Sequence, residues 1–190
     1  MELELPKLET PLDWEYYNQP TWDERYTDVR IGFLHPLFRH KARTIINMAN
    51  WSYDRKFRIT RDGHLRSPAT QERLWQQGRT PKGNVVGHTV TNARAWQSIH
   101  NYGFAVDCVL IEDNGQPIWK SAEEYELLHA IGRHVGAVPI TPPDGWDAFH
   151  LEDQRYNDWR TLKAFRDNGK TFTESDAGPV YVDVTNYPNT

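Results

Sequence analysis

One segment constrains the fold more than any other, the stretch from Phe104 to Ile111, which is apolar except for Asp107 and is followed by the polar sequence Glu112-Asp113-Asn114-Gly115. Its length, its β-branched residues and the turn residues after it predict a strand. A chain of 190 residues buries roughly 70% of the surface that its unfolded form exposes, so it can build a core without disulfides or other cross-links. We therefore expect a globular protein.

Segments with helical periodicity lie on both sides of this strand. Proline, glycine or capping residues mark their ends, as in Ser67-Pro68 at the start and Gly78 at the end of the second segment. The four expected helices cover about 36–50, 67–78, 121–136 and 156–169. Shorter strands are expected at 57–60, 85–92 and 148–152, with an edge strand at 180–182. A small sheet among clustered helices indicates an α+β fold rather than a doubly wound α/β sheet.

We expect one catalytic domain at 31–170, an extended N-terminal arm at 1–30 and a C-terminal tail at 171–190. The net charge is −4 without a basic block, so we expect no nucleic acid partner and no anionic membrane surface as partner. The single cysteine, Cys108, excludes an intrachain disulfide and a Cys-rich zinc finger. No apolar run is long enough for stable membrane insertion. The N-terminus has no secretory signal pattern, so synthesis in the cytoplasm is expected.

Two segments carry residues suited to metal chemistry. In the first, His100 and Asp107 are seven residues apart, and a turn at Gly103 can bring them together. In the second, Asp147 precedes His150 by three residues. Three protein ligands (His100, Asp107 and His150) with one open position are typical of a catalytic zinc site, and Asp147 is placed to act as a general base.

Each segment alone is also compatible with ordinary structural residues. A histidine is more often structural or exposed than a ligand, and Asp107 can be a solvated carboxylate. We expect His64 to be solvated in its loop and His129 to lie on a helix surface, while Cys108 is expected to be a small buried hydrophobic residue. For Glu152 we leave two roles open, orientation of His150 or plain exposure.

At these residues the sequence resembles a known family. Ser98 to Asp107 matches the signature Ser-x-His-x-x-Gly-x-Ala-x-Asp of the zinc D-alanyl-D-alanine carboxypeptidases and L-alanyl-D-glutamate endopeptidases, which include phage endolysins and bacterial cell-wall peptidases. The pair Asp147 and His150 matches its second motif. Residues 66–80 agree with a third pattern, Arg-Ser, then Gln, then Gln-Gly-Arg-Thr. The similarity covers roughly residues 35–152.

The resemblance implies a small antiparallel sheet with flanking helices, the Hedgehog/D,D-peptidase type of fold. It implies a Zn²⁺ cofactor held by His100, Asp107 and His150. The other implied roles are Asp147 as catalytic acid and base, Arg66 as the cation that steadies the oxyanion, and Ser98 as a substrate-binding residue. The sequence departs from the family in an extra residue between Gly63 and Arg66, and in Trp96 where glycine is usual.

The resemblance implies hydrolysis of peptidoglycan stem peptides, and we favour an L-alanyl-D-glutamate endopeptidase of endolysin type. A D-alanyl-D-alanine carboxypeptidase is the alternative within the family, and a non-catalytic zinc-bound wall-binding or virion protein is the alternative of another class. The same His/Asp set can also hold another divalent ion. We expect a monomer that acts on the cell wall, after phage-mediated release or as part of a virion.

Overall fold

The computed structural model describes residues 24–53, 56–119, 123–143 and 145–188. A five-stranded antiparallel sheet lies at its centre. The strand order is β1-β2-β5-β4, and β3 pairs with the C-terminal end of β2. The strands are β1 (Lys56–Ile59), β2 (Ala105–Ile111), β3 (Pro117–Ile118), β4 (Ala137–Val138) and β5 (His150–Asp153). Every residue of β2 is buried, so the most apolar segment of the sequence forms the middle of the sheet.

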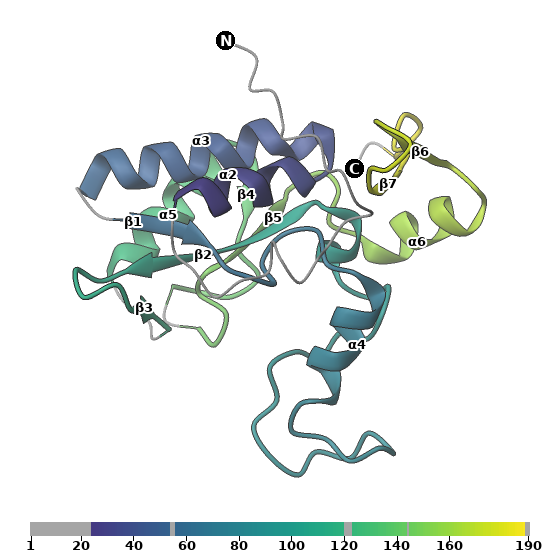
Figure 1. The fold of residues 1–190 in the computed structure, drawn as a ribbon, viewed down its shortest axis with the longest axis horizontal. Helices are drawn as coiled ribbons and strands as arrows, with labels where there is room; N and C mark the ends of the chain where they lie inside the picture. The colour runs from purple at the N-terminus through teal and green to yellow at the C-terminus, as the bar shows by residue number, and fades with distance from the viewer. Residues whose placement is uncertain (1–23, 54–55, 120–122, 144, 189–190) are drawn as a thin grey trace.

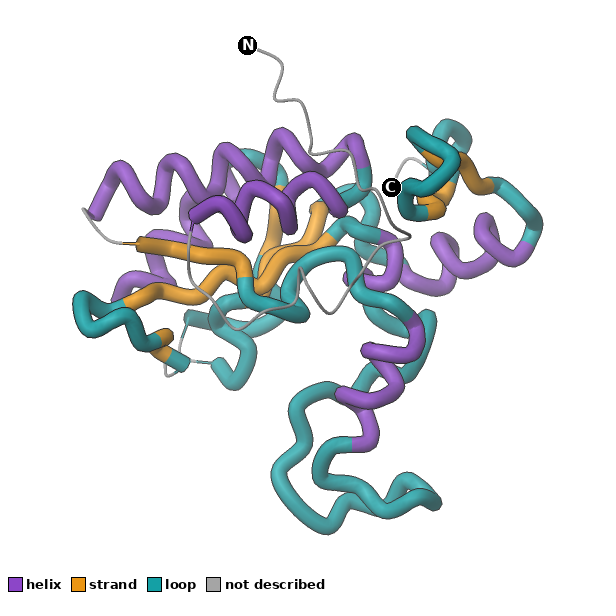
Figure 2. Tube along the Cα trace, viewed as in Figure 1, coloured by secondary structure: helices purple, strands orange, loops and turns teal. Residues whose placement is uncertain are grey.

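Helices cover the sheet along one face, as Figures 1 and 2 show. The long helix α3 (Pro36–Tyr53) contacts α2 (Glu24–Phe33), α5 (Glu123–His134) and β1. Its apolar stripe of Phe38, Ala42, Ile45, Ile46 and Ala49 is buried in the main core, as the helical spacing of these residues predicts. The sequence expectation of an α+β fold with an antiparallel sheet and flanking helices is confirmed.

The C-terminal segment packs back onto the body of the protein. Helix α6 (Trp159–Asp167) leads into a hairpin of β6 (Thr171–Thr173) and β7 (Val180–Val182). Tyr181 and Val182 are buried, and Nε2 of His35 lies 2.9 Å from the carbonyl oxygen of Val182. The hairpin is therefore attached to the start of α3 through a buried polar contact.

Helix α4 (Pro68–Gln76) and the loop after it project away from the sheet and its covering helices (Figures 1 and 2). Ser67 caps the helix by accepting a hydrogen bond from the N–H of Thr70, and Gly78 follows its end with a φ of 70°. These ends agree with the sequence expectation. The strand expected at 85–92 is wrong, because the only pairing there is an isolated bridge between Arg79 and Val85.

A second difference lies at the N-terminus. Residues 24–33 form a helix, where the sequence suggested an extended arm up to residue 30; the earlier part of that arm, 1–23, lies outside the described residues. Thr27 and Arg30 of this helix are buried, and Arg30 donates to the carbonyl oxygen of Ile59 at 2.7 Å. Of the helices that the structure describes, none has the length and apolar character needed to span a bilayer. The expected domain boundaries stay a prediction.

Candidate metal centre

The register of the central strands places two of the candidate ligands side by side. Asp107 of β2 and His150 of β5 are direct partners in the antiparallel ladder. Directly opposed residues point to the same face of a sheet with their Cβ atoms roughly 5 Å apart. Here Nδ1 of His150 lies 3.0 Å from Oδ1 of Asp107. The sheet itself therefore brings together residues that are far apart in the sequence.

The third candidate, His100, reaches the pair from a short 3-10 helix, η1 (Ile99–Tyr102), that precedes β2. The hydroxyl of Ser98 accepts a hydrogen bond from the N–H of His100 and caps the start of this turn. Gly103 ends it with a φ of 76°, and a Cβ atom there would lie 2.5 Å from the backbone nitrogen of His35. A side chain at Gly103 would thus meet both backbone strain and a clash, which explains the glycine between His100 and Asp107.

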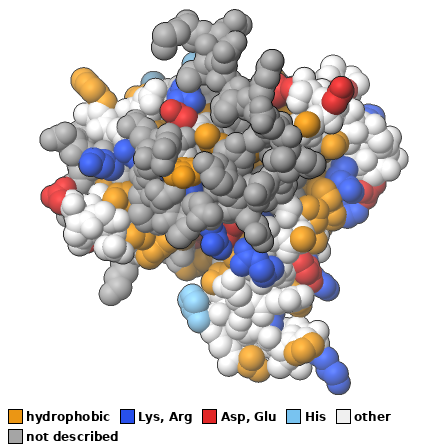
Figure 3. Space-filling model, viewed as in Figure 1, with side chains coloured by type: hydrophobic (Ala, Val, Ile, Leu, Met, Phe, Trp, Pro, Cys, Tyr) orange, Lys and Arg blue, Asp and Glu red, His pale blue; other side chains and the backbone are white. Residues whose placement is uncertain are grey.

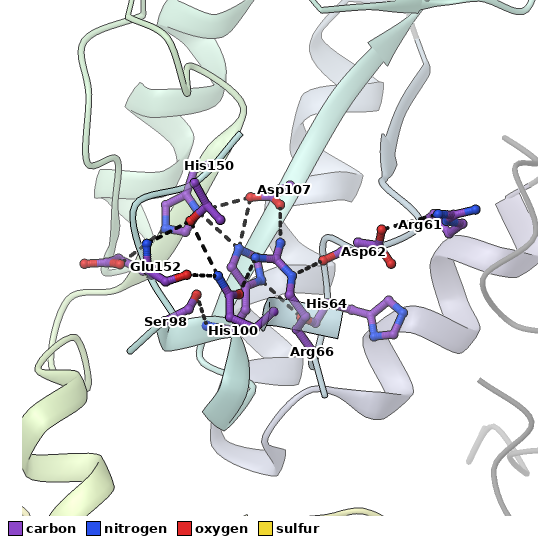
Figure 4. A network of polar contacts seen from close by, with 12 residues as sticks. Arg61, Asp62, His64, Arg66, Ser98, His100, Asp107, His150 and Glu152 are labelled. Carbon is purple, nitrogen blue, oxygen red and sulfur yellow. Dashed lines mark hydrogen bonds and ion pairs between the residues drawn. The ribbon is translucent and has the colours of Figure 1, made fainter. Parts of the chain in front are cut away.

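The three side chains form one buried cluster, shown in Figure 4. Nε2 of His100 lies 3.1 Å from Oδ1 of Asp107 and 3.2 Å from Nδ1 of His150. Ligands at the usual bond lengths of a tetrahedral zinc ion are separated by about 3.3 Å, so these atoms are already at the right spacing. The cluster can hold a metal ion through Nε2 of His100, Oδ1 of Asp107 and Nδ1 of His150.

The remaining polar atoms of the three side chains are held from outside the cluster. Nδ1 of His100 lies 3.1 Å from the carbonyl oxygen of His64, and Nε2 of His150 lies 3.3 Å from Oε2 of Glu152. Because a carbonyl and a carboxylate only accept hydrogen bonds, these contacts place the protons on Nδ1 of His100 and on Nε2 of His150. The opposite nitrogens, Nε2 of His100 and Nδ1 of His150, are the ones that can offer a lone pair to a metal once it displaces any proton they carry. Of the two roles left open for Glu152, the structure favours orientation of His150.

Arg66 lies directly behind Asp107. Its Nη2 donates to Oδ2 of Asp107 at 3.1 Å, its Nη1 to Oε1 of Gln71 at 2.8 Å and its Nε to the carbonyl oxygen of Asp62 at 2.8 Å. These bonds use three of the five N–H donors of a guanidinium. Despite the extra residue before it, the Arg66 guanidinium is therefore directed at the cluster (Figure 4).

Asp147 lies at the entrance to β5, where its carbonyl oxygen accepts a hydrogen bond from the N–H of His150 at 3.1 Å. Its side chain is half-buried. Burial, and then the negative charge of Asp107, raise the pKa of Asp147 to about 6, against the opposing effect of the positive groups His150 and Arg66. A carboxyl group with a pKa near neutrality can both accept and donate a proton under ordinary conditions.

Burial and the neighbouring charges shift the pKa values of the three cluster residues in different directions. Burial lowers the pKa of His100 to about 4, with a further contribution from Arg66. Burial also disfavours charge on Asp107, but the charge of His100 and the hydrogen bonds from both histidines hold the pKa of Asp107 well below its usual range. At His150 burial is outweighed by hydrogen bonds to Asp107 and Glu152, which raise its pKa to about 10. A metal ion bound to Nδ1 of His150 must displace a proton, so binding is coupled to pH.

Every residue that the sequence motifs suggested therefore lies at or beside one cluster: His100, Asp107, His150, Asp147, Arg66 and Ser98. Two expectations about neighbouring histidines are wrong, since His64 and His129 are both buried. His64 supplies the carbonyl oxygen that holds His100, and Nε2 of His129 lies 2.6 Å from the carbonyl oxygen of Ala148. Cys108 is buried, as expected.

Sequence reasoning missed Asn101, whose side chain connects two parts of the site. Its Nδ2 donates to the carbonyl oxygen of Arg66 at 2.9 Å, and its Oδ1 accepts from the N–H of Trp96 at 2.9 Å. Trp96 has a φ of 65°, a left-handed conformation that favours glycine. Trp96 adopts this glycine-like backbone while adding a large ring.

Comparison with known proteins finds similarity to a characterised peptidase. Over 87 residues the chain is 39% identical to the peptidoglycan L-alanyl-D-glutamate endopeptidase CwlK of Bacillus subtilis (strain 168). The chain resembles a peptidoglycan endopeptidase. The aligned part makes up 45% of this chain and 47% of the relative, so the chain spans about half the length of the curated relative it matches. No protein-family model matches the chain.

Proposed function

We propose that the protein is a zinc-dependent peptidase that hydrolyses the stem peptides of peptidoglycan, with the L-alanyl-D-glutamate bond as its target. The observation that carries the proposal is the buried cluster of His100, Asp107 and His150. The polar atom of each side chain that faces away from the cluster contacts a further group, namely the carbonyl oxygen of His64, the guanidinium of Arg66 or the carboxylate of Glu152. The similarity to CwlK supports the choice of substrate. This substrate implies that the protein acts in the cell wall.

The donor set fits Zn²⁺, because two imidazoles and one carboxylate are ordinary zinc ligands and three protein ligands leave one position open. A zinc ion bound there would polarise the scissile carbonyl and activate a water molecule. Asp147 would accept the proton that this water loses and deliver it to the leaving amine. Arg66, with two N–H donors left over from its bonds within the described residues, would donate to the carbonyl oxygen as negative charge develops.

The test is digestion of purified peptidoglycan with and without a chelator, with the released termini identified by mass spectrometry. We expect new N-terminal D-glutamate, lost with the chelator and restored by zinc. Release of free D-alanine would instead identify a D-alanyl-D-alanine carboxypeptidase. No product from a zinc-loaded protein would contradict the peptidase and favour a non-catalytic wall-binding or virion protein.

A pair of variants tests the assignment of Asp147. Asp147→Asn keeps the size of the side chain but cannot accept the proton, so we expect a fall in rate of about 10²–10⁴-fold with an unchanged zinc content. Asp113→Asn, in the exposed turn after β2, is the matched control and should retain the wild-type rate. Full turnover by Asp147→Asn would contradict its role as the general base.

A further inference from the structure

The segment that leads from Arg66 to Asp107 has an unusual charge pattern. No aspartate or glutamate occurs between Glu72 and Asp107, whereas the same stretch contains Arg73, Arg79, Lys82 and Arg94. The chain as a whole carries a net charge of −4. The stretch has a net positive charge because it contains no acidic residue. Its four basic residues are spread along the sequence and form no continuous block.

Most of this stretch lies in the part of the molecule that projects from the sheet. We define the arm as residues 67–97, comprising α4 and the loop after it. The arm begins next to Arg66 and ends next to Ser98, so residues at the metal site flank it on both sides. Figures 1 and 3 show the arm extending away from the body, with basic and apolar side chains on its surface.

The arm is ordered by its own contacts. The guanidinium groups of Arg79 and Arg94 lie 4.9 and 4.5 Å from the ring centre of Trp75. The N–H groups of Val86 and Gly87 both donate to the carbonyl oxygen of Gly78. A surface that is already ordered loses little conformational entropy when it binds a partner.

Two of the four cations of the arm have acidic partners, since Arg94 pairs with Glu72 and Arg73 lies 3.4 Å from Asp62. Among the described residues, Arg79 and Lys82 have none. Lys82 is exposed at the turn of the arm. Close to it, Val85 and Val86 are 66% and 70% exposed. The outer end of the arm therefore offers positive charge and apolar surface to a partner.

We propose that the arm binds the anionic peptides of the wall network beyond the scissile bond, with Lys82 and Arg79 facing their carboxylates. This inference rests on the proposed function. A glutamate within a peptide chain uses one of its two carboxyl groups in the chain and leaves the other as an anion, so the uncut peptides of the network around the scissile bond also carry negative charge. Charge complementarity of this kind raises the rate of association and sets orientation.

The test compares the charge reversal Lys82→Glu with the matched control Lys56→Glu. Lys56 is also exposed, and it lies at the start of β1, the end of that strand away from Arg66. Each variant and the wild type are assayed on insoluble cross-linked peptidoglycan freed of phosphodiester polymers, and on a short soluble peptide that contains only the residues around the scissile bond. All assays are run at low and at high salt.

We expect Lys82→Glu to lower the rate on insoluble peptidoglycan about three- to tenfold at low salt, with the difference disappearing as salt screens the charges. The rate on the short peptide should not change, and Lys56→Glu should match the wild type on both substrates. Equal behaviour of the two variants would overturn the proposal. A loss seen only on walls that retain phosphodiester polymers would also overturn it and would assign the arm to those polymers.

Sedimentation with the same insoluble peptidoglycan separates this inference from the proposed function. If the wild type cleaves neither substrate, the proposed function fails, and the bound fraction still decides the role of the arm. Lys82→Glu should then bind less than Lys56→Glu at low salt, and equal binding of the two would contradict the proposal.

Discussion

Arg66 and Asp107 form a buried ion pair, in which Nη2 of the guanidinium lies 3.1 Å from Oδ2 of the carboxylate. The other carboxylate oxygen, Oδ1, faces both His100 and His150. Asp107 thus contacts the two histidines with Oδ1 and Arg66 with Oδ2. This arrangement fixes which oxygen is free to bind a metal and places a positive charge beside the candidate metal site.

Arg66→Lys tests whether the geometry of the guanidinium matters beyond its charge. A lysine ammonium cannot reach Asp107, Gln71 and the carbonyl oxygen of Asp62 at once, because it lacks the planar fork of arginine. We expect the single-turnover rate of hydrolysis to fall about 10²-fold with zinc still bound. The measurement is single-turnover hydrolysis together with metal analysis, and Arg73→Lys on exposed α4 surface is the control. A wild-type rate for Arg66→Lys would show that charge alone suffices.

Glu152→Ala tests the contact that orients His150. Loss of the carboxylate removes the acceptor at 3.3 Å from Nε2 of His150, so the ring is free to rotate and to exchange its proton. We expect zinc affinity to fall about 10–100-fold, measured by competition with a chromophoric chelator. Glu152→Gln keeps an acceptor oxygen and should lose less, while Glu126→Ala on α5 should bind zinc as the wild type does. Equal affinities for all three variants would rule out an orienting role.

The sequence predicted the elements whose signals are local. Proline and glycine marked the ends of α4, the apolar run marked β2, and the spacing of His100, Gly103 and Asp107 predicted the turn that joins them. These features depend on neighbours in the chain, so the order of residues is enough to find them.

Features set by packing between distant segments were not predictable in this way. His64 lies in a loop by sequence, yet it is buried with its ring stacked against Phe33 of α2 at 5.8 Å between ring centres. His129 is buried because α5 packs against the segment that leads into β5. The role of Asn101 requires three segments to meet, at Arg66, Trp96 and η1. Contacts of this kind, between segments that are distant in the sequence, leave no local sequence pattern.

Two substitutions at Trp96 separate the backbone strain from the contribution of the ring. The indole packs under the guanidinium of Arg166 at 3.6 Å and near the ring of Tyr102, and both Trp96→Gly and Trp96→Ala remove it. Only alanine keeps a Cβ atom in the left-handed backbone, so we expect Trp96→Gly to be more stable than Trp96→Ala by about 1 kcal/mol. Urea unfolding measures the difference. A more stable alanine variant would mean that this backbone relaxes when the ring is removed.

His35 gives the fold a defined sensitivity to acid. Its Nε2 donates to the carbonyl oxygen of Val182 and its Nδ1 accepts from the N–H of Leu37, so the neutral ring satisfies both contacts and a second proton would break one. Burial lowers the pKa of His35 to about 4, although the bond to Val182 opposes the shift. The unfolded chain, with a pKa near 6.5, therefore binds more protons than the folded protein between these values.

The contribution of His35 to stability is consequently full and independent of pH well above pH 6.5, and it is lost progressively as the pH drops through 6.5 towards 4. At pH 5 the expected loss in the free energy of unfolding from this residue is about 2 kcal/mol. His35→Gln does not titrate, so its deficit in stability relative to the wild type should be largest at pH 7.5 and should shrink by about this amount at pH 5. Urea unfolding of both proteins at the two pH values measures the change. A deficit that stays constant with pH would show that His35 is protonated equally in the folded and unfolded states.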